Sequence, residues 1–115
     1  MRRLVAVGVL AFAGTAVASA PPVGPLPKAK VTAVKTTRGS FFSVTLPVRN
    51  GGYSWRIARP FNSRVVGEVA EADVGPTVVL VFKAVGRGRT SIVVGETKGE
   101  TARAYRAVRY DVTVT

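Results

Sequence analysis

From Val31 onward, apolar residues occur in short runs that are separated by glycine, proline, asparagine or aspartate. In three of these runs, which begin at Phe42, Tyr53 and Val108, every second residue is apolar. This alternation is typical of strands with one buried and one solvated face, and no remaining segment has the length and period of an amphipathic helix. The pattern predicts seven strands, over Lys30–Thr36, Phe41–Leu46, Tyr53–Ala58, Arg64–Ala70, Thr77–Lys83, Thr90–Gly95 and Ala104–Val114.

The segment Val78–Phe82 differs from the other runs because all of its residues are apolar. We predict that it is a central strand, covered on both faces or at least poorly exposed. Seven short strands within residues 30–115 favour an all-β, immunoglobulin-like β-sandwich. Trp55 is the single tryptophan, and we expect its indole in the core, where it would fill the space between two sheets.

Residues 1–18 are predicted to be a secretory signal peptide. Two arginines precede an apolar run, Leu4–Ala18, that contains no charge. Small residues in an A-x-A pattern favour cleavage after Ala18, because cleavage after Ala20 would leave Pro21 directly behind the cut. An uncleaved membrane anchor is the alternative, since the run is close to the shortest length that spans a bilayer. The expected location is secreted, or in the periplasm or cell envelope.

Residues 19–29 are predicted to be an extended tether, because Pro21–Pro27 contains four prolines. Proline lacks an N–H group and has a fixed φ, so this segment cannot join the hydrogen-bond ladder of a sheet. The remainder, residues 30–115, has the size of one domain. Cysteine is absent, so packing and sheet hydrogen bonds alone must hold an exported domain of this size together.

The sequence has a formal net charge of +11. Without the two arginines of the signal peptide, 15 basic and 6 acidic side chains remain, for a net charge of +9. Such a surplus attracts anionic partners, such as acidic proteins, anionic envelope polymers or lipid headgroups. A solvated surface that only maintains solubility is the alternative. Nucleic acid is not expected as a partner, because the basic residues are scattered and form no recognisable binding motif.

Histidine and cysteine are both absent, which removes the commonest general bases, the thiolate nucleophile and the usual zinc ligands. Glu68, Glu71 and Asp73 are close in sequence, but they are divided between a strand and a turn, so we do not expect a calcium site. Paired-carboxylate catalysis would require two acids to converge across a cleft, which a small sandwich seldom provides. We therefore expect neither an enzyme nor a bound metal or cofactor.

Several segments resemble the chagasin family of cysteine-peptidase inhibitors, which are small immunoglobulin-like domains. The resemblance covers roughly residues 40–114 and concerns mainly the scaffold. The segments that carry it are Phe42–Pro47, Gly52–Trp55, Val81–Ala84, the turn Gly86–Gly88, Thr90–Val94 and Tyr110–Val114.

Members of this family block papain-like peptidases by inserting three neighbouring loops into the active-site cleft. The family's first loop, Asn-Pro-Thr-Thr-Gly, corresponds to Val48–Gly52, where only the final glycine is shared. Its second, glycine-rich loop corresponds to Asp73–Pro76. Its third loop has an Arg-Pro-Trp signature, whereas Glu96–Ala102 contains neither proline nor tryptophan.

The resemblance implies a secreted, monomeric inhibitor whose partner is a papain-like cysteine peptidase. The alternative is a non-inhibitory envelope or adhesive module that binds through a basic surface. Ordinary turn chemistry is also sufficient to explain Asn50–Gly52. The loop residues expected to contact a partner are Arg49, Asn50, Gly51, Gly52, Val74, Gly75, Pro76, Thr97, Lys98 and Gly99.

Overall fold

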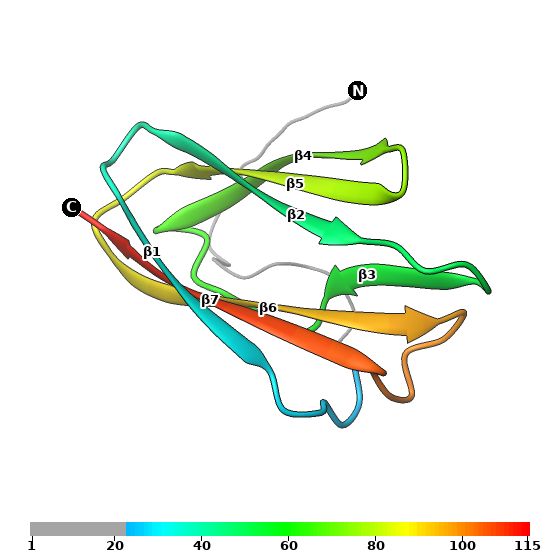
Figure 1. Cartoon of the computed structure of the whole chain (residues 1–115). Helices are drawn as coiled ribbons and strands as arrows, with labels where there is room; N and C mark the ends of the chain where they lie inside the picture. Colours follow the sequence, from blue (N-terminus) through cyan, green and yellow to red (C-terminus); the bar gives the residue numbers. More distant parts are fainter. Residues whose placement is uncertain (1–22) are drawn as a thin grey trace.

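The computed structural model describes residues 23–115, which form two facing β-sheets and contain no helix (Figure 1). The predicted signal peptide, residues 1–18, lies outside the described residues. Within residues 23–115, no helix is long and apolar enough to cross a membrane. The strands are β1 (Lys30–Thr36), β2 (Phe41–Pro47), β3 (Tyr53–Ile57), β4 (Val66–Val74), β5 (Thr77–Ala84), β6 (Gly88–Lys98) and β7 (Arg106–Val114).

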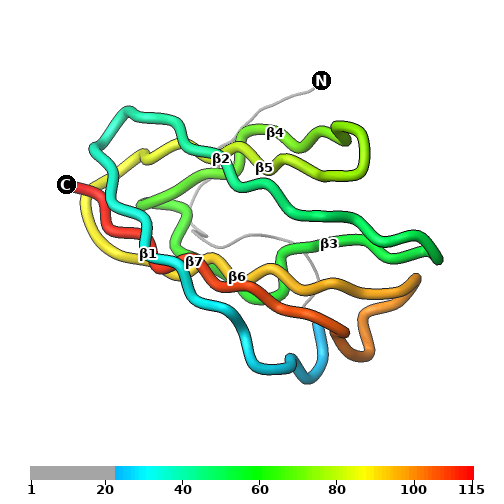
Figure 2. Tube along the Cα trace, in the orientation of Figure 1, coloured from blue at the N-terminus to red at the C-terminus, as the bar shows by residue number. Residues whose placement is uncertain are grey.

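The two sheets differ in size. One contains four strands in the order β1-β7-β6-β3, and the other contains three in the order β2-β5-β4. β1 is parallel to β7, and all other neighbouring strands are antiparallel. The trace in Figure 2 shows the two sheets as separate layers, with β2, β4 and β5 in one and β1, β3, β6 and β7 in the other. The predicted all-β sandwich is confirmed.

All seven predicted strands are present, and their limits differ most at β4 and β6. β4 continues to Val74, beyond the predicted end at Ala70. β6 continues to Lys98, beyond the predicted end at Gly95. The end of β6 is paired with β3 on one side and with β7 on the other. Pairing with both neighbours at Glu96, and with β3 alone at Thr97 and Lys98, keeps these polar residues in the strand, and this constraint cannot be read from the hydrophobic pattern.

The core lies between the sheets and is centred on Phe82 of β5, which is completely buried. Its ring stacks on Phe42 at a centroid distance of 5.4 Å and meets Phe61 edge to face at 6.3 Å. β5 is the middle strand of its sheet, as predicted; its inner residues are buried and its outer residues, which include Val79, are half-buried. Trp55 belongs to the same core and is 7% exposed, which confirms its predicted place.

The segment before β1 packs onto the sandwich over residues 23–29. Val23 is 3% exposed within a small apolar cluster. The Gly24 amide donates to the Thr101 carbonyl at 2.8 Å, and the Arg59 guanidinium donates to the carbonyls of both Val23 and Gly24. The prolines keep this part of the predicted tether out of the sheets, and main-chain hydrogen bonds hold it against the domain.

The aromatic core leads to a stability prediction. Phe82→Ala should lower the free energy of unfolding by about 3–5 kcal/mol, because it opens a cavity where two other rings pack. The matched control is Phe41→Ala, since Phe41 begins the neighbouring strand but is 61% exposed; its effect should stay within about 0.5 kcal/mol. Urea unfolding followed by Trp55 fluorescence measures both. Equal losses in the two variants would contradict this description of the core.

Candidate functional site

Three connections between strands lie together at one end of the sandwich. They follow the ends of β2, β4 and β6, whose arrowheads point to the same side of the molecule in Figure 1. These connections are the β2–β3 loop (residues 48–52), the β4–β5 turn (residues 75–76) and the β6–β7 loop (residues 99–105). We call the surface formed by these three connections the loop end.

Two contacts place the β2–β3 loop between the other two connections. The Val48 amide donates to the Pro76 carbonyl at 2.9 Å, which joins this loop to the β4–β5 turn. On the other side, Tyr53 pairs with Lys98 at the point where the β6–β7 loop begins. The three segments that sequence analysis proposes for partner binding are therefore neighbours in space.

Glu96 is completely buried beneath the loop end, where it binds two arginines. Arg49 of the β2–β3 loop donates to the two carboxylate oxygens at 2.5 and 3.2 Å. Arg106 of β7 donates to the same oxygens at 2.7 and 3.0 Å. Both contacts are bidentate, which is the strongest geometry for a pair of this kind. The buried carboxylate thus connects the central loop to the sheet that carries β6 and β7.

The protonation of Glu96 depends on two opposing effects. Burial alone raises the pKa of the carboxyl group, because the charged form loses hydration. Hydrogen bonds from Arg106 and Arg49, together with their charges, outweigh burial and lower the pKa to about 2. At neutral pH the carboxylate is charged and its oxygens are occupied, so Glu96 positions the loops and is not free to act as a general base.

Two tyrosines extend this network toward the surface. The rings of Tyr53 and Tyr105 meet edge to face at a centroid distance of 5.6 Å. The Arg49 guanidinium lies 4.1 Å from the Tyr53 centroid, and the Lys98 Nζ lies 5.3 Å from it. The Arg103 guanidinium lies 4.5 Å from the Tyr105 centroid. Cations over aromatic faces are attracted to them, so these side chains restrict one another beside the loops.

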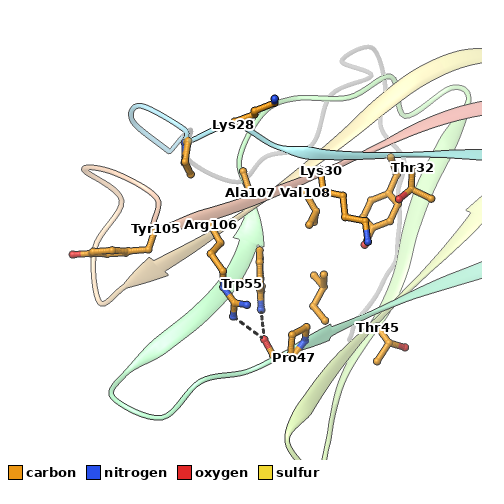
Figure 3. A pocket seen from close by; sticks show the side chains of 13 residues that line it. Lys28, Lys30, Thr32, Thr45, Pro47, Trp55, Tyr105, Arg106, Ala107 and Val108 are labelled. Carbon is orange, nitrogen blue, oxygen red and sulfur yellow. Dashed lines mark hydrogen bonds between the residues drawn. The ribbon is translucent and has the colours of Figure 1, made fainter.

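A groove of about 570 Å³ opens next to the loop end, lined by residues of β1, β7 and β2 (Figure 3). In it, the Trp55 indole N–H donates to the Pro47 carbonyl at 2.7 Å, and Arg106 donates to the same oxygen at 3.4 Å. Lys28 and Lys30 also line the groove, which contains no carboxylate. Its lining therefore combines basic and aromatic side chains with apolar ones such as Leu46 and Val108. Residues 23–115 contain no group of acidic side chains that could hold a metal ion.

Most of the predicted contact residues are exposed at the loop end. Gly51 and Gly52 have φ angles of 105° and 86°, which residues with a side chain rarely adopt. Glycine is therefore required for the path of the central loop. The exposed members of the predicted set are Arg49, Asn50, Gly51, Gly52, Val74, Gly75, Pro76, Lys98 and Gly99.

Thr97 departs from the predicted set. Because β6 continues to Lys98, Thr97 lies within the strand and is completely buried. Its hydroxyl accepts a hydrogen bond from Arg56 at 3.1 Å, so it is a structural residue and does not face a partner. Arg49 lies in the loop as predicted, but its guanidinium points toward Glu96 and supports the loop from beneath.

Glu96, Arg106 and Tyr105 also belong to this end of the molecule, although the predicted set of contact residues does not include them. The hydrophobic pattern places the start of the last strand at Ala104, which assigns Tyr105 to that strand. β7 begins at Arg106, so the exposed ring of Tyr105 belongs to the β6–β7 loop. Glu96 and Arg106 are opposite each other in the β6–β7 ladder. The signal available in the sequence is therefore an acid and a base on either side of a predicted hairpin loop.

Comparison with solved structures finds this fold in a cysteine protease inhibitor, EhICP2 from Entamoeba histolytica. The TM-score is 0.56 at 15% sequence identity, and the match covers 77% of this chain and 99% of EhICP2. No protein-family model matches the chain, and no curated protein sequence matches it. The comparison confirms the predicted resemblance at the level of the fold.

The low pKa of Glu96 leads to a prediction about acid stability. The unfolded chain binds a proton at this residue at a higher pH than the folded chain does, so the stability from Glu96 is present at neutral pH and is lost as pH falls from about 5 to about 2. Glu96→Gln should lower the free energy of unfolding at pH 7 by roughly 2 kcal/mol. The difference from the unmodified chain should shrink through that acidic range in urea titrations.

The control is Glu100→Gln, because Glu100 is exposed in the β6–β7 loop and its side chain only accepts a bond from the Ala102 amide. This variant should follow the unmodified chain at every pH. Stability curves for Glu96→Gln and the unmodified chain that stay parallel down to pH 2 would contradict the assignment.

Proposed function

We propose that this chain is an inhibitor of papain-like cysteine peptidases that occupies the active-site cleft with its loop end. One observation carries the proposal: three connections lie side by side at one end of a fold that is also found in a cysteine protease inhibitor. The β2–β3 loop would enter the cleft centrally, and the other two connections would contact its two sides.

The surface chemistry of the loop end supports this role. Val74 is 55% exposed beside the β4–β5 turn, and Tyr105 is exposed in the β6–β7 loop. Exposed valine and tyrosine supply apolar and aromatic contact area on either side of the glycines of the central loop. Aromatic residues are the commonest anchors in protein interfaces. The loop end therefore has glycines without side chains at its centre and larger side chains on either side of them.

The support beneath the loops also favours a binding role. Two ion pairs that share Glu96, one with Arg49 and one with Arg106, hold the central loop before any partner arrives. The Val48–Pro76 hydrogen bond also holds it. A loop that is already ordered loses less conformational entropy when it binds. Such an inhibitor excludes substrate and water from the catalytic thiolate by shape. It needs no nucleophile, metal or cofactor of its own.

The proposal includes export of the chain and a protein as its partner. The apolar run behind two arginines supports export. An exported inhibitor would meet peptidases outside the cell or in the envelope.

Inhibition assays test the proposal. The purified chain should inhibit papain-type peptidases competitively at submicromolar concentration when cleavage of a fluorogenic peptide is followed. Val74→Asp should raise the inhibition constant by roughly ten-fold or more, because it would bury an unpaired charge in the interface.

The matched control is Val85→Asp, since Val85 is 42% exposed in the connection between β5 and β6, at the opposite end of the sandwich. This variant should inhibit as the unmodified chain does. If the two aspartate variants lose inhibition equally, the loop end is not the contact surface. If the unmodified chain fails to inhibit several such peptidases at micromolar concentration, the proposed function itself is refuted.

A further inference from the structure

The end of the sandwich opposite the loop end is built from the other three connections. These are the segments between β1 and β2 (residues 37–40), β3 and β4 (residues 58–65) and β5 and β6 (residues 85–87). In Figure 1 they lie on the side where the C-terminus is marked.

Main-chain hydrogen bonds join these three connections into one surface. The Gly39 amide donates to the Ala84 carbonyl at 2.7 Å, which links the first connection to the end of β5. The amides of Val85 and Gly86 both donate to the Val65 carbonyl, at 2.9 and 3.3 Å, which links the third connection to the second. The residues on these segments therefore share a defined arrangement.

Six basic side chains lie on these three connections and on the strand ends beside them, which together we call the basic end. Each connection contributes one exposed arginine, and the adjoining strand ends contribute the rest. Lys35 and Arg89 both pair with Thr113, one on each side of it, so they point outward from the four-stranded sheet, whereas Lys83 points outward from the three-stranded sheet on the other face of the sandwich. The six residues are Lys35, Arg38, Arg64, Lys83, Arg87 and Arg89.

The acidic side chains do not neutralise this surface. Glu96 is bound to arginines at the loop end, and Asp111 is bound to Arg109 at 2.7 Å. The other four acids lie along β4 and in the β6–β7 loop. Within residues 23–115, none of the six cations of the basic end forms a salt bridge. A terminal carboxylate at Thr115, whose carbonyl accepts the Arg38 amide, would offset one of the six charges.

Two large apolar side chains are exposed among these cations. Phe41 begins β2 and is 61% exposed, and Val85 lies in the β5–β6 connection and is 42% exposed. The Lys83 Nζ lies 5.5 Å from the Phe41 ring centroid. An exposed aromatic ring beside a lysine, at an end of the domain that also carries arginines, is the composition that peripheral proteins present to the boundary between headgroups and acyl chains.

We propose that the basic end docks on an anionic lipid bilayer. Each lysine or arginine near such a surface contributes a similar increment of attraction, and Phe41 and Val85 would insert between the headgroups. A soluble polyanion would use the charges but would leave both apolar side chains in water. The exposed phenylalanine therefore favours a bilayer as the partner. Docking in this way leaves the loop end on the far side of the domain.

Vesicle flotation with purified residues 19–115, the form that the predicted signal cleavage leaves, tests this proposal. Partitioning onto vesicles of phosphatidylcholine mixed with phosphatidylglycerol should exceed that onto phosphatidylcholine alone, and it should fall as salt is raised. Arg38→Ser combined with Arg87→Ser should weaken partitioning by roughly 30-fold at low salt. Phe41→Ser should weaken it at both low and high salt, because salt does not screen an apolar contact.

The matched control is Lys28→Ser combined with Lys30→Ser, which removes the same charge from exposed positions outside the basic end. It should weaken partitioning by less than about 3-fold. Residues 19–115 leave out the apolar run Leu4–Ala18, which by itself would partition onto both neutral and anionic vesicles. Arg64→Ser combined with Arg89→Ser repeats the test at independent positions, and circular dichroism checks that each variant is folded.

Three results would overturn the proposal. The first is equal partitioning onto neutral and anionic vesicles. The second is an equal loss in the control and in the basic-end variants. The third is tight binding to a soluble sulfated polysaccharide without any preference for anionic vesicles, which would assign the basic end to a soluble polymer. None of these results bears on peptidase inhibition, which depends on the opposite end.

Discussion

The hydrogen bond from the Trp55 indole to the Pro47 carbonyl joins the two sheets at the place where the core ends and the loops begin. Trp55 belongs to β3 of the larger sheet, and Pro47 is the last residue of β2 in the smaller one. The chain has no cysteine, so contacts of this kind must fix how the sheets face each other. The buried indole anchors the bond on one side, and the β2–β3 loop starts directly after the bond on the other. The position of the central loop therefore depends on the packing of the core.

Glu96 also fixes the position of the central loop, at a point nearer the loop end than Trp55. Burial of a carboxylate is costly unless its charge is paired and its oxygens accept hydrogen bonds. Here two arginines from different elements meet that requirement, Arg49 from the loop and Arg106 from β7. The main effect of the Arg49–Glu96–Arg106 network is to fix the position of Arg49. An apolar residue in place of Glu96 could fill the same space, but it could not hold Arg49. Two arginines from different elements are thus held together by one of the chain's few acids.

The hydrophobic pattern was sufficient to predict the strands because each one alternates or is continuously apolar, and turn residues mark where it stops. Trp55 could be placed in the core for the same reason. The limits of β6 could not be predicted, because its last residues are polar and are kept in the sheet by neighbours distant in sequence. For the same reason the sequence does not show that Glu96 and Thr97 are buried. Both are polar and follow the apolar part of β6, so they resemble loop residues until the strand pairing is known. The pattern places Tyr105 in a strand because its neighbours in sequence are compatible with one.

The two ends of the domain can act independently because of their separation. The connections alternate along the chain between one end and the other, so neighbouring loops in sequence lie far apart in space. The domain measures 36 × 32 × 27 Å along its principal axes, whereas charges in physiological salt are screened over about 8 Å. Charge at the basic end therefore exerts little force on a partner at the loop end. The sandwich fixes the positions of the two ends relative to each other, while salt screens the charge of one end from the other. One surface could therefore hold the domain in place while the other remains open to a peptidase.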